Sequence, residues 1–262
     1  MCDEIRVLHV DDDHDFAALT ATVLERGDDQ FDVTTAHRPS EGLSLLASEP
    51  FDCVISDYEM PRTNGIEFLG RVREEYPDLP FVLFTGKGSE AVASEAISAG
   101  VTDYLQKQRG TKQYELLANR LRNAVAQRRA ERRAAETTRR YEVLFTHTPN
   151  AIVSVTLEDG VPIIQSVNPA FEALFVPTRT DPIGQNLDDL VTGTDAQAER
   201  ARKITERTRA GETTVWEVTR ETVDGPRDFR LHAIPIESPA AAESAYAVYA
   251  DVTDLGEEGD EA

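Results

Sequence analysis

Short apolar runs alternate with amphipathic stretches over residues 5–107. The apolar runs have the length of buried strands, and the stretches between them place apolar residues such as Phe16, Leu19 and Val23 at helical spacing. Strands that alternate with helices of about ten residues predict a parallel sheet with helices on both faces. The predicted strands cover residues 5–10, 31–36, 52–57, 79–85 and 101–107, and the predicted helices cover residues 15–27, 39–48, 65–75 and 89–99. We expect the last of these helices to begin at Ser89 and to end at Gly100.

Charged and hydroxyl side chains gather where these strands end. Asp11 and Asp12 follow the first strand, Asp57 ends the third, and Thr85 and Lys107 end the fourth and fifth. The carboxyl ends of parallel strands share one edge of the sheet, where ligands of α/β proteins bind. Several carboxylates at one edge make an oxygen site that Mg²⁺ accepts, and a lysine and a threonine beside them suit phosphoryl oxygens. The edge therefore predicts transfer of a phosphoryl group to a carboxylate.

The ordinary alternative is that these acids are solvated surface, turn or N-cap residues. We assign that role to Asp13 and Asp15. For Asp57, Asp12 and Lys107 we favour the functional interpretation, because the ordinary one does not predict that all three converge on one edge.

Four motifs in this order resemble those of response-regulator receiver domains. They are Val10-Asp11-Asp12, then Ser56-Asp57 with Met60-Pro61 and Gly65, then Phe84-Thr85, then Tyr104-Leu105-Gln106-Lys107. The resemblance covers residues 3–126, within a domain placed at residues 1–126. It implies a flavodoxin-like, doubly wound sheet of five parallel strands in the order 2-1-3-4-5.

The resemblance also implies a role for each acid at the edge. Asp57 is implied to be the phosphoacceptor, modified to 4-aspartylphosphate. Asp12, Asp57 and the main-chain carbonyl of Glu59 are implied to ligate Mg²⁺, and Asp11 to act through water.

The same resemblance implies that Lys107 contacts the phosphoryl group. It implies that Thr85, besides its catalytic role, acts with Tyr104 to couple phosphorylation to the face around the fourth helix and the fifth strand. Two positions depart from the family pattern. Gln108 stands where a proline is usual, so no cis peptide is expected there, and Gly86 stands where alanine is commoner.

A long helix is predicted to follow, over residues 111–145. Its apolar stripe begins at Tyr114, and no glycine or proline lies between Gly110 and Pro149. Unbroken, it would span on the order of 50 Å. Residues 128–140 carry six arginines, but without interleaved aromatics and with acidic sequence on both sides they do not indicate nucleic-acid binding. A signalling helix, a dimerising helix and a solvated linker remain alternatives.

The second half of the chain predicts an antiparallel sheet with helices on one side. The apolar runs are at residues 151–155, 163–167, 213–222, 227–236 and 245–252, and helices are expected from Pro169 and over residues 195–210. This half, residues 141–254, resembles a PAS domain, an α+β fold. The resemblance is carried by Leu144-Phe145, Pro149 to Ile152, Val167 to Phe171, Ile183-Gly184 and Asp251 to Asp254. The two-domain arrangement is similar to haloarchaeal receiver–PAS signalling proteins.

The ligand of the PAS-like half is not fixed by its residues. It has no cysteine for flavin photochemistry, and its histidines, His147 in the entry turn and His232 in a strand, are expected to be ordinary satisfied or exposed residues rather than haem ligands. Trp216 is expected to pack in the core or at a dimer face. The ligand therefore stays unknown, an empty pocket included.

The composition of the chain limits its expected partners and its expected cellular location. The formal net charge of −21 opposes binding to nucleic acid and to anionic membranes, and it fits a salt-rich, halophilic cytoplasm that screens self-repulsion. Cys2 and Cys53 form no disulfide framework or metal cluster. No leader and no membrane-spanning apolar run is found, so a cytoplasmic location is expected. The acidic tail, residues 255–262, is expected to be disordered.

The combined sequence predicts a phosphorelay, or two-component, signalling protein. A histidine kinase or phosphotransfer protein would phosphorylate Asp57 in a Mg²⁺-dependent reaction, and a helix would relay the state to a PAS sensing or docking domain. Homodimerisation through the linker helix or the PAS domain stays open. Beyond the receiver's own phosphotransfer and dephosphorylation no catalytic domain is recognised, and whether to class the protein as an enzyme is left undecided. The alternative is a non-catalytic ligand sensor or scaffold that uses the receiver for interaction.

Overall fold

The computed structural model describes residues 4–86, 90–236 and 244–253. Contacts divide the chain into two compact units, Met1–Glu136 and Thr137–Ala262, and each unit is described by itself. Ser89, Asp254 and the tail at residues 255–262 lie outside the described residues, so the expectations for them stay predictions.

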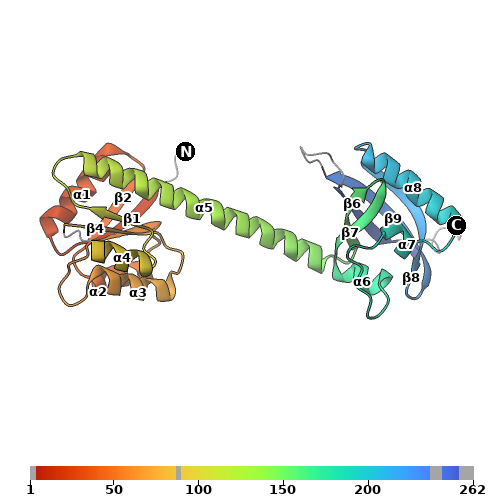
Figure 1. Cartoon of the computed structure of the whole chain (residues 1–262), viewed down its shortest axis with the longest axis horizontal. Helices are drawn as coiled ribbons and strands as arrows, with labels where there is room; N and C mark the ends of the chain where they lie inside the picture. Colours follow the sequence, from red (N-terminus) through yellow and green to blue (C-terminus); the bar gives the residue numbers. More distant parts are fainter. Residues whose placement is uncertain (1–3, 87–89, 237–243, 254–262) are drawn as a thin grey trace, which may run out of the picture. The chain divides into compact units, whose positions relative to one another are not determined.

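The first unit contains a parallel sheet in the order β2-β1-β3-β4-β5, which confirms the predicted topology. From β1 to β5, the described strands and helices of this unit alternate (Figure 1). The elements are β1 (Ile5–Val10), α1 (His14–Gly27), β2 (Phe31–Ala36), α2 (Pro39–Ser48), β3 (Cys53–Ser56), α3 (Gly65–Glu75), β4 (Phe81–Thr85), α4 (Glu90–Ser98) and β5 (Asp103–Gln106).

Both faces of this sheet are buried because side chains alternate along β1. Leu8 and Val10 join a core cluster with Phe68 of α3, and the helices α2, α3 and α4 cover that face. Val7 joins a second cluster with Leu24 of α1, which the first part of helix α5 (Lys112–His147) completes. Two cores, one on each face, hold the strand ends in place.

Short polar residues set the helix starts next to the strand ends. The Asp13 carboxylate accepts hydrogen bonds from the main-chain nitrogens of Asp15 and Phe16 at 3.1 and 3.0 Å, so Asp13 is the N-cap of α1, the ordinary role expected for it. Asn64 caps α3 in the same way. At the end of α4, Gly100 has φ 81°, the left-handed conformation expected of a C′ glycine.

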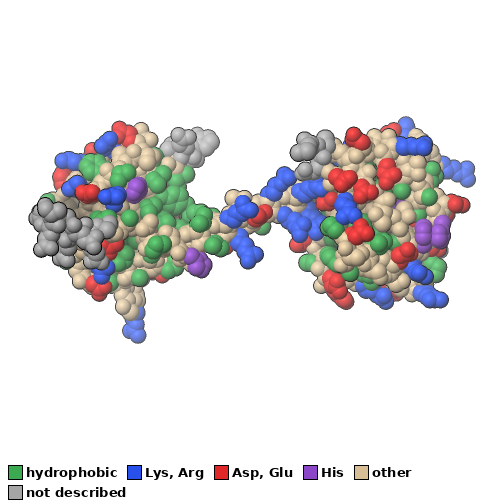
Figure 2. Space-filling model, turned by 180° about the vertical axis from the view of Figure 1, so that it is seen from behind, with side chains coloured by type: hydrophobic (Ala, Val, Ile, Leu, Met, Phe, Trp, Pro, Cys, Tyr) green, Lys and Arg blue, Asp and Glu red, His purple; other side chains and the backbone are tan. Residues whose placement is uncertain are grey.

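Helix α5 is 36 residues long and confirms the predicted long helix. Only its first part is buried, through Tyr114, Leu117, Leu121 and Val125. Farther along, arginine side chains project from its exposed central part (Figure 2). Arg129 fastens the end of the buried part, since its Nη2 lies 2.7 Å from the Glu4 carbonyl oxygen and 3.0 Å from the Asp52 carboxylate.

The second unit is built on an antiparallel sheet in the order β7-β6-β10-β9-β8. Its elements are β6 (Ala151–Glu158), β7 (Val161–Val167), α6 (Pro169–Phe175), α7 (Leu187–Val191), α8 (Asp195–Arg209), β8 (Thr214–Thr222), β9 (Gly225–Ile236) and β10 (Ser244–Asp251). The predicted five-stranded sheet is confirmed. The short helix α7 was not predicted, and His147 ends helix α5 instead of lying in the turn after it.

Aromatic side chains fill the core of the second unit between the sheet and its helices. Phe171 and Phe175 of α6 lie against Phe229 of β9 and Tyr249 of β10, with ring centroids 5.2 to 6.2 Å apart across the pairs that join α6 to these two strands. Trp216 is half-buried and packs against the edge of this core, which confirms one of its two expected roles.

The fully buried Asn168 ties this core to the end of α5. Its Nδ2 donates to the carbonyl oxygens of Phe145 and Asn150 at 3.0 and 2.9 Å. Its Oδ1 accepts from the main-chain nitrogens of Ile152 and Phe171, both at 2.9 Å. All four bonds of one amide are used, which explains why asparagine stands at the start of this helix.

Across the described part of the chain, we find no helix with both the length and the apolar character that crossing a bilayer needs.

Candidate functional site

The strand ends of the first unit deliver charged residues to one edge of the sheet. The Asp11 main-chain nitrogen bonds the Ala36 carbonyl at 3.0 Å, and the Asp57 nitrogen bonds the Val10 carbonyl at 2.9 Å. The Lys107 nitrogen bonds the Thr85 carbonyl at 2.8 Å. Each functional residue therefore continues the hydrogen-bond ladder of the sheet, and the sheet register fixes its position.

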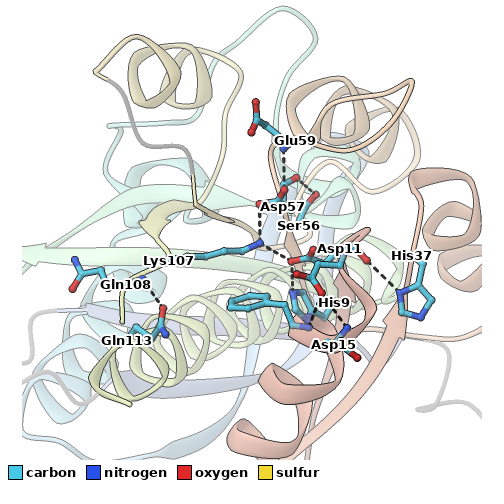
Figure 3. A network of polar contacts seen from close by, with 12 residues as sticks. His9, Asp11, Asp15, His37, Ser56, Asp57, Glu59, Lys107, Gln108 and Gln113 are labelled. Atoms are coloured by element: carbon cyan, nitrogen blue, oxygen red, sulfur yellow. Dashed lines mark hydrogen bonds and ion pairs between the residues drawn. The ribbon is translucent and has the colours of Figure 1, made fainter. Parts of the chain in front are cut away.

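Lys107 lies between two carboxylates at this edge (Figure 3). Its Nζ is 2.7 Å from Asp11 Oδ2 and 3.0 Å from Asp57 Oδ1. It also lies 4.2 Å from the centre of the Phe16 ring, in a cation–π contact. The three residues directly follow β1, β3 and β5, so the convergence predicted from the sequence is observed.

The turn after β3 fixes the Asp57 carboxylate. Its Oδ2 accepts a hydrogen bond from the main-chain nitrogen of Glu59 at 3.0 Å, while the Ser56 hydroxyl donates to the Asp57 carbonyl oxygen at 2.8 Å. Gly65 lies against this turn, and a Cβ added there would be 2.3 Å from the Asp57 carbonyl oxygen. Only glycine allows this approach of α3 to the turn.

The acids at the edge form a candidate metal centre. One carboxylate oxygen from each of Asp11, Asp12 and Asp57 can be chosen so that all lie within 4.8 Å of one another. Asp11 and Asp57 are buried and Asp12 is exposed. Burial raises the pKa of Asp11, and Lys107 opposes that rise. An all-oxygen donor set that is open to solvent on one side fits Mg²⁺, which keeps several water ligands.

His9 lies beside this centre and was not singled out by the sequence. It is fully buried, and its Nε2 is 3.7 Å from Asp11 Oδ2. Burial, with the charge of Lys107 adding to it, lowers the pKa of His9 to about 3, so the imidazole is neutral at physiological pH. The signal in the sequence was a histidine within the apolar part of β1, between Leu8 and Val10. Phe16 was recognised only as a helix residue, because its contact with Lys107 depends on tertiary packing.

The remaining predicted residues lie near the centre. Thr85 is buried at the end of β4, at the same edge as Asp57. Tyr104 of β5 packs against the cluster that α2, α3 and α4 cover, and its hydroxyl is buried without a hydrogen-bond partner among the described residues. The peptide bond between Lys107 and Gln108 is trans, as expected.

Known proteins share both halves of this architecture. Residues 7–119 match the response regulator receiver domain. The chain belongs to the response-regulator receiver family. A PAS domain follows the receiver domain, matched over residues 149–254. These two domains are the two units that the structure shows.

Several curated relatives match part of this chain. FleR, a response regulator protein of Pseudomonas aeruginosa, is 41% identical over 103 residues, which are 39% of this chain and 21% of FleR. An uncharacterised 14.6 kDa protein of Leptolyngbya boryana is 38% identical over 106 residues, or 40% of this chain and 79% of that protein. The chain thus spans only about a fifth of the length of FleR. Among solved structures, a receiver domain protein from Clostridium thermocellum has 26% identity and a TM-score of 0.44, and the match covers 48% of this chain and 98% of that one.

Proposed function

We propose that this protein acts in two-component phosphorelay signalling, with Asp57 as the acceptor of a phosphoryl group from a histidine kinase or a phosphotransfer protein. The observation that carries the proposal is the position of Lys107 Nζ, 2.7 Å from Asp11 and 3.0 Å from Asp57, in a cluster with a third carboxylate. A cation held between two acids from different strands is arranged to receive added negative charge.

The transfer joins an Asp57 carboxylate oxygen to the phosphorus of a phosphohistidine. The P–O bond of an acyl phosphate forms while the P–N bond breaks, and the departing imidazole nitrogen keeps the electron pair and takes a proton from solvent. Lys107 interacts with the transferred oxygens, and the Thr85 hydroxyl donates a hydrogen bond to one of them. The Glu59 nitrogen keeps the Asp57 carboxylate oriented. Hydrolysis of the acyl phosphate by water restores the carboxylate, and no other catalysis is proposed for the chain.

Asp12, Asp57 and the Glu59 carbonyl would hold Mg²⁺, with Asp11 acting through water. When bound, the ion supplies charge neutralisation at the phosphoryl oxygens. Asp12 lines an open cavity of about 390 Å³ together with Glu59, Met60 and Asn64, so a phosphoryl donor has room to approach from that side.

We further propose that Thr85 and Tyr104 respond to phosphorylation and that α5 carries the response to the PAS domain, which has a sensing role. The unpartnered Tyr104 hydroxyl supports this switch, because a buried hydroxyl without a partner is poised to take a new position. Helix α5 is continuous between the receiver cluster and the PAS core, to which Asn168 ties the Phe145 carbonyl. Homodimerisation through α5 or the PAS domain and adaptation to high salt stay predictions.

The test is phosphorylation of the full chain by acetyl phosphate with Mg²⁺, followed on a phosphate-affinity gel. We expect the wild-type chain to be phosphorylated (labelled) and Asp57→Asn to stay unphosphorylated. Phosphorylation of the wild type should stop when EDTA removes the metal. Asp52→Asn is the matched control, because Asp52 lies at the opposite end of β3 and its loss should leave labelling intact. Equal labelling of wild type and Asp57→Asn would remove Asp57 as the acceptor, and no labelling of wild type would favour the scaffold alternative.

A further inference from the structure

Strand β8 of the PAS domain carries an arginine where its pattern calls for an apolar residue. Alternate positions of β8 face the core, and Val218 and Arg220 occupy two successive core-facing positions. Arg220 is only 2% exposed. A buried guanidinium needs anionic or carbonyl partners to offset its lost hydration.

Arg220 lacks those partners in the described structure. Its Nε and Nη1 are buried without a hydrogen-bond acceptor. The neighbouring Tyr249 hydroxyl interacts with the guanidinium, but a phenol is neutral. Burial raises the pKa of Tyr249 to about 12, so its O–H remains a hydrogen-bond donor. Two donor groups of a buried cation are therefore unused, which in a native fold calls for an explanation.

Arg220 is one of the residues that line a cavity inside the PAS domain. The cavity has a volume of about 40 Å³ and lies between the sheet and helices α7 and α8. Most of its lining is apolar, with Leu157, Ile204 and Leu231 among the residues. One water molecule needs on the order of 10–15 Å³ measured in this way, so the cavity accepts a molecule of a few non-hydrogen atoms and is far too small for haem or flavin.

Asp188 of α7 lines the same cavity with an opposite charge. Burial raises its pKa to about 6, and the attraction of Arg220 opposes that rise. Among the described residues, no hydrogen bond and no ion pair shorter than 4.0 Å joins Asp188 to Arg220. Asp188 and Arg220 both line the cavity but do not form an ion pair with each other.

We propose that this cavity binds a small organic carboxylate, with the carboxylate on Arg220 and the alkyl part against the apolar lining. The planar guanidinium matches a carboxylate in shape and charge, and the Tyr249 hydroxyl supplies a further donor. A simple carboxylic acid and a small amino acid share this chemistry, and in the second case the ammonium would lie toward Asp188. This inference rests on the sensing role proposed for the PAS domain and names the class of ligand that the domain would sense. The binding itself does not depend on phosphorylation of Asp57.

Equilibrium dialysis of the full chain at constant NaCl tests the proposal. The probes are radiolabelled acetate and glycine, with acetamide as the uncharged molecule of the same shape as acetate. We expect saturable binding of acetate, glycine or both with a Kd on the order of 1 mM or tighter, and at least tenfold weaker binding of acetamide. Acetate alone would indicate a simple acid, and glycine alone an amino acid.

Two variants assign the binding to the cavity. Arg220→Met keeps the length of the side chain and removes its charge, so it should weaken binding at least tenfold. Arg230→Met is the matched control, because Arg230 lies on the paired strand β9 with its side chain 52% exposed, and its binding should equal that of wild type. If Arg220→Met does not fold, Tyr249→Phe and the wild-type comparison of acetate with acetamide decide the question.

Three results would overturn the proposal: no saturable binding of either carboxylate up to about 10 mM, equal binding of acetate and acetamide, or unchanged binding in Arg220→Met. Each can occur while Asp57 is still phosphorylated by acetyl phosphate. Failure of the ligand site is thus distinguishable from failure of the proposed phosphorelay function.

Discussion

Lys107 of the receiver domain is a partly buried cation and Arg220 of the PAS domain a fully buried one, and their surroundings differ. Lys107 has two carboxylates within 3.0 Å, from Asp11 and Asp57. Arg220 has no acidic partner within ion-pair distance in the described structure, and two of its nitrogens have no acceptor. The Lys107 ammonium is paired with carboxylates of its own chain, whereas two nitrogens of Arg220 lack an acceptor among the described residues, which a ligand can supply. The burial of a charged side chain alone therefore does not indicate a ligand site. The number of acceptors that the chain itself supplies to that side chain does.

Removing the partnered cation should have the largest effect. Lys107→Met removes the ammonium that lies between Asp11 and Asp57, and with it a charge that stabilises the transferring phosphoryl group. Loss of one such group typically lowers a rate about 10²–10³-fold. We expect that reduction in the rate of labelling by acetyl phosphate at saturating Mg²⁺, measured as a time course on phosphate-affinity gels.

Lys203→Met is the matched control, since Lys203 lies on α8 with 62% of its side chain exposed. Its labelling rate should equal that of wild type. If Lys107→Met were labelled as fast as the control, the contacts of Lys107 would be structural and the contrast with Arg220 would lose its functional meaning.

The contact between α3 and the turn after β3 gives the next largest effect. In Gly65→Ala the new Cβ would meet the Asp57 carbonyl oxygen at 2.3 Å and Leu83 Cδ2 at 2.7 Å, so the turn must move. Overpacking of this kind costs about 1–3 kcal/mol, and we expect the upper part of that range because a backbone atom is involved. Chemical denaturation of the full chain, followed through the receiver transition, measures the loss.

Gly70→Ala on the same helix is the control, because nothing lies within 4 Å of its added Cβ. Alanine there should stabilise the receiver by about 0.5–1 kcal/mol through its higher helix propensity. Equal effects of the two substitutions would mean that the turn holding Asp57 is not constrained by the approach of α3.

The same contrast separates what the sequence could predict from what it could not. Asp11, Asp57 and Lys107 were predictable because each ends a strand of a parallel sheet, and the carboxyl ends of such strands share one edge. Arg220 was not, because its position depends on which face of β8 packs against the core. An arginine in a strand is normally assigned to the solvent face. His9 and Asp188 were not predicted for the same reason, because their roles depend on which face of their strand or helix packs against the core.

The smallest expected effect concerns the acid that shares the cavity with Arg220. The folded state gives Asp188 a pKa of about 6, above the ordinary value of 3.8, because burial disfavours its charged form. The folded state thus binds the proton more tightly than the unfolded state does. The resulting stability is fully present below about pH 4 and is lost as the pH rises through about 6.

Asp188→Asn should therefore stabilise the PAS domain by roughly 1–2 kcal/mol at pH 7.5, less than the full shift implies because the side chain is partly exposed. It should also flatten the decline in stability between pH 4 and 6. Thermal unfolding of the full chain across this range measures both, with the exposed Glu206→Gln on α8 as control. If Asp188→Asn instead destabilised the domain at pH 7.5, Asp188 would be the charge partner that Arg220 needs. Lys107 and Arg220 would then both be paired with acids of the chain itself, and the argument for a carboxylate ligand would lose its basis.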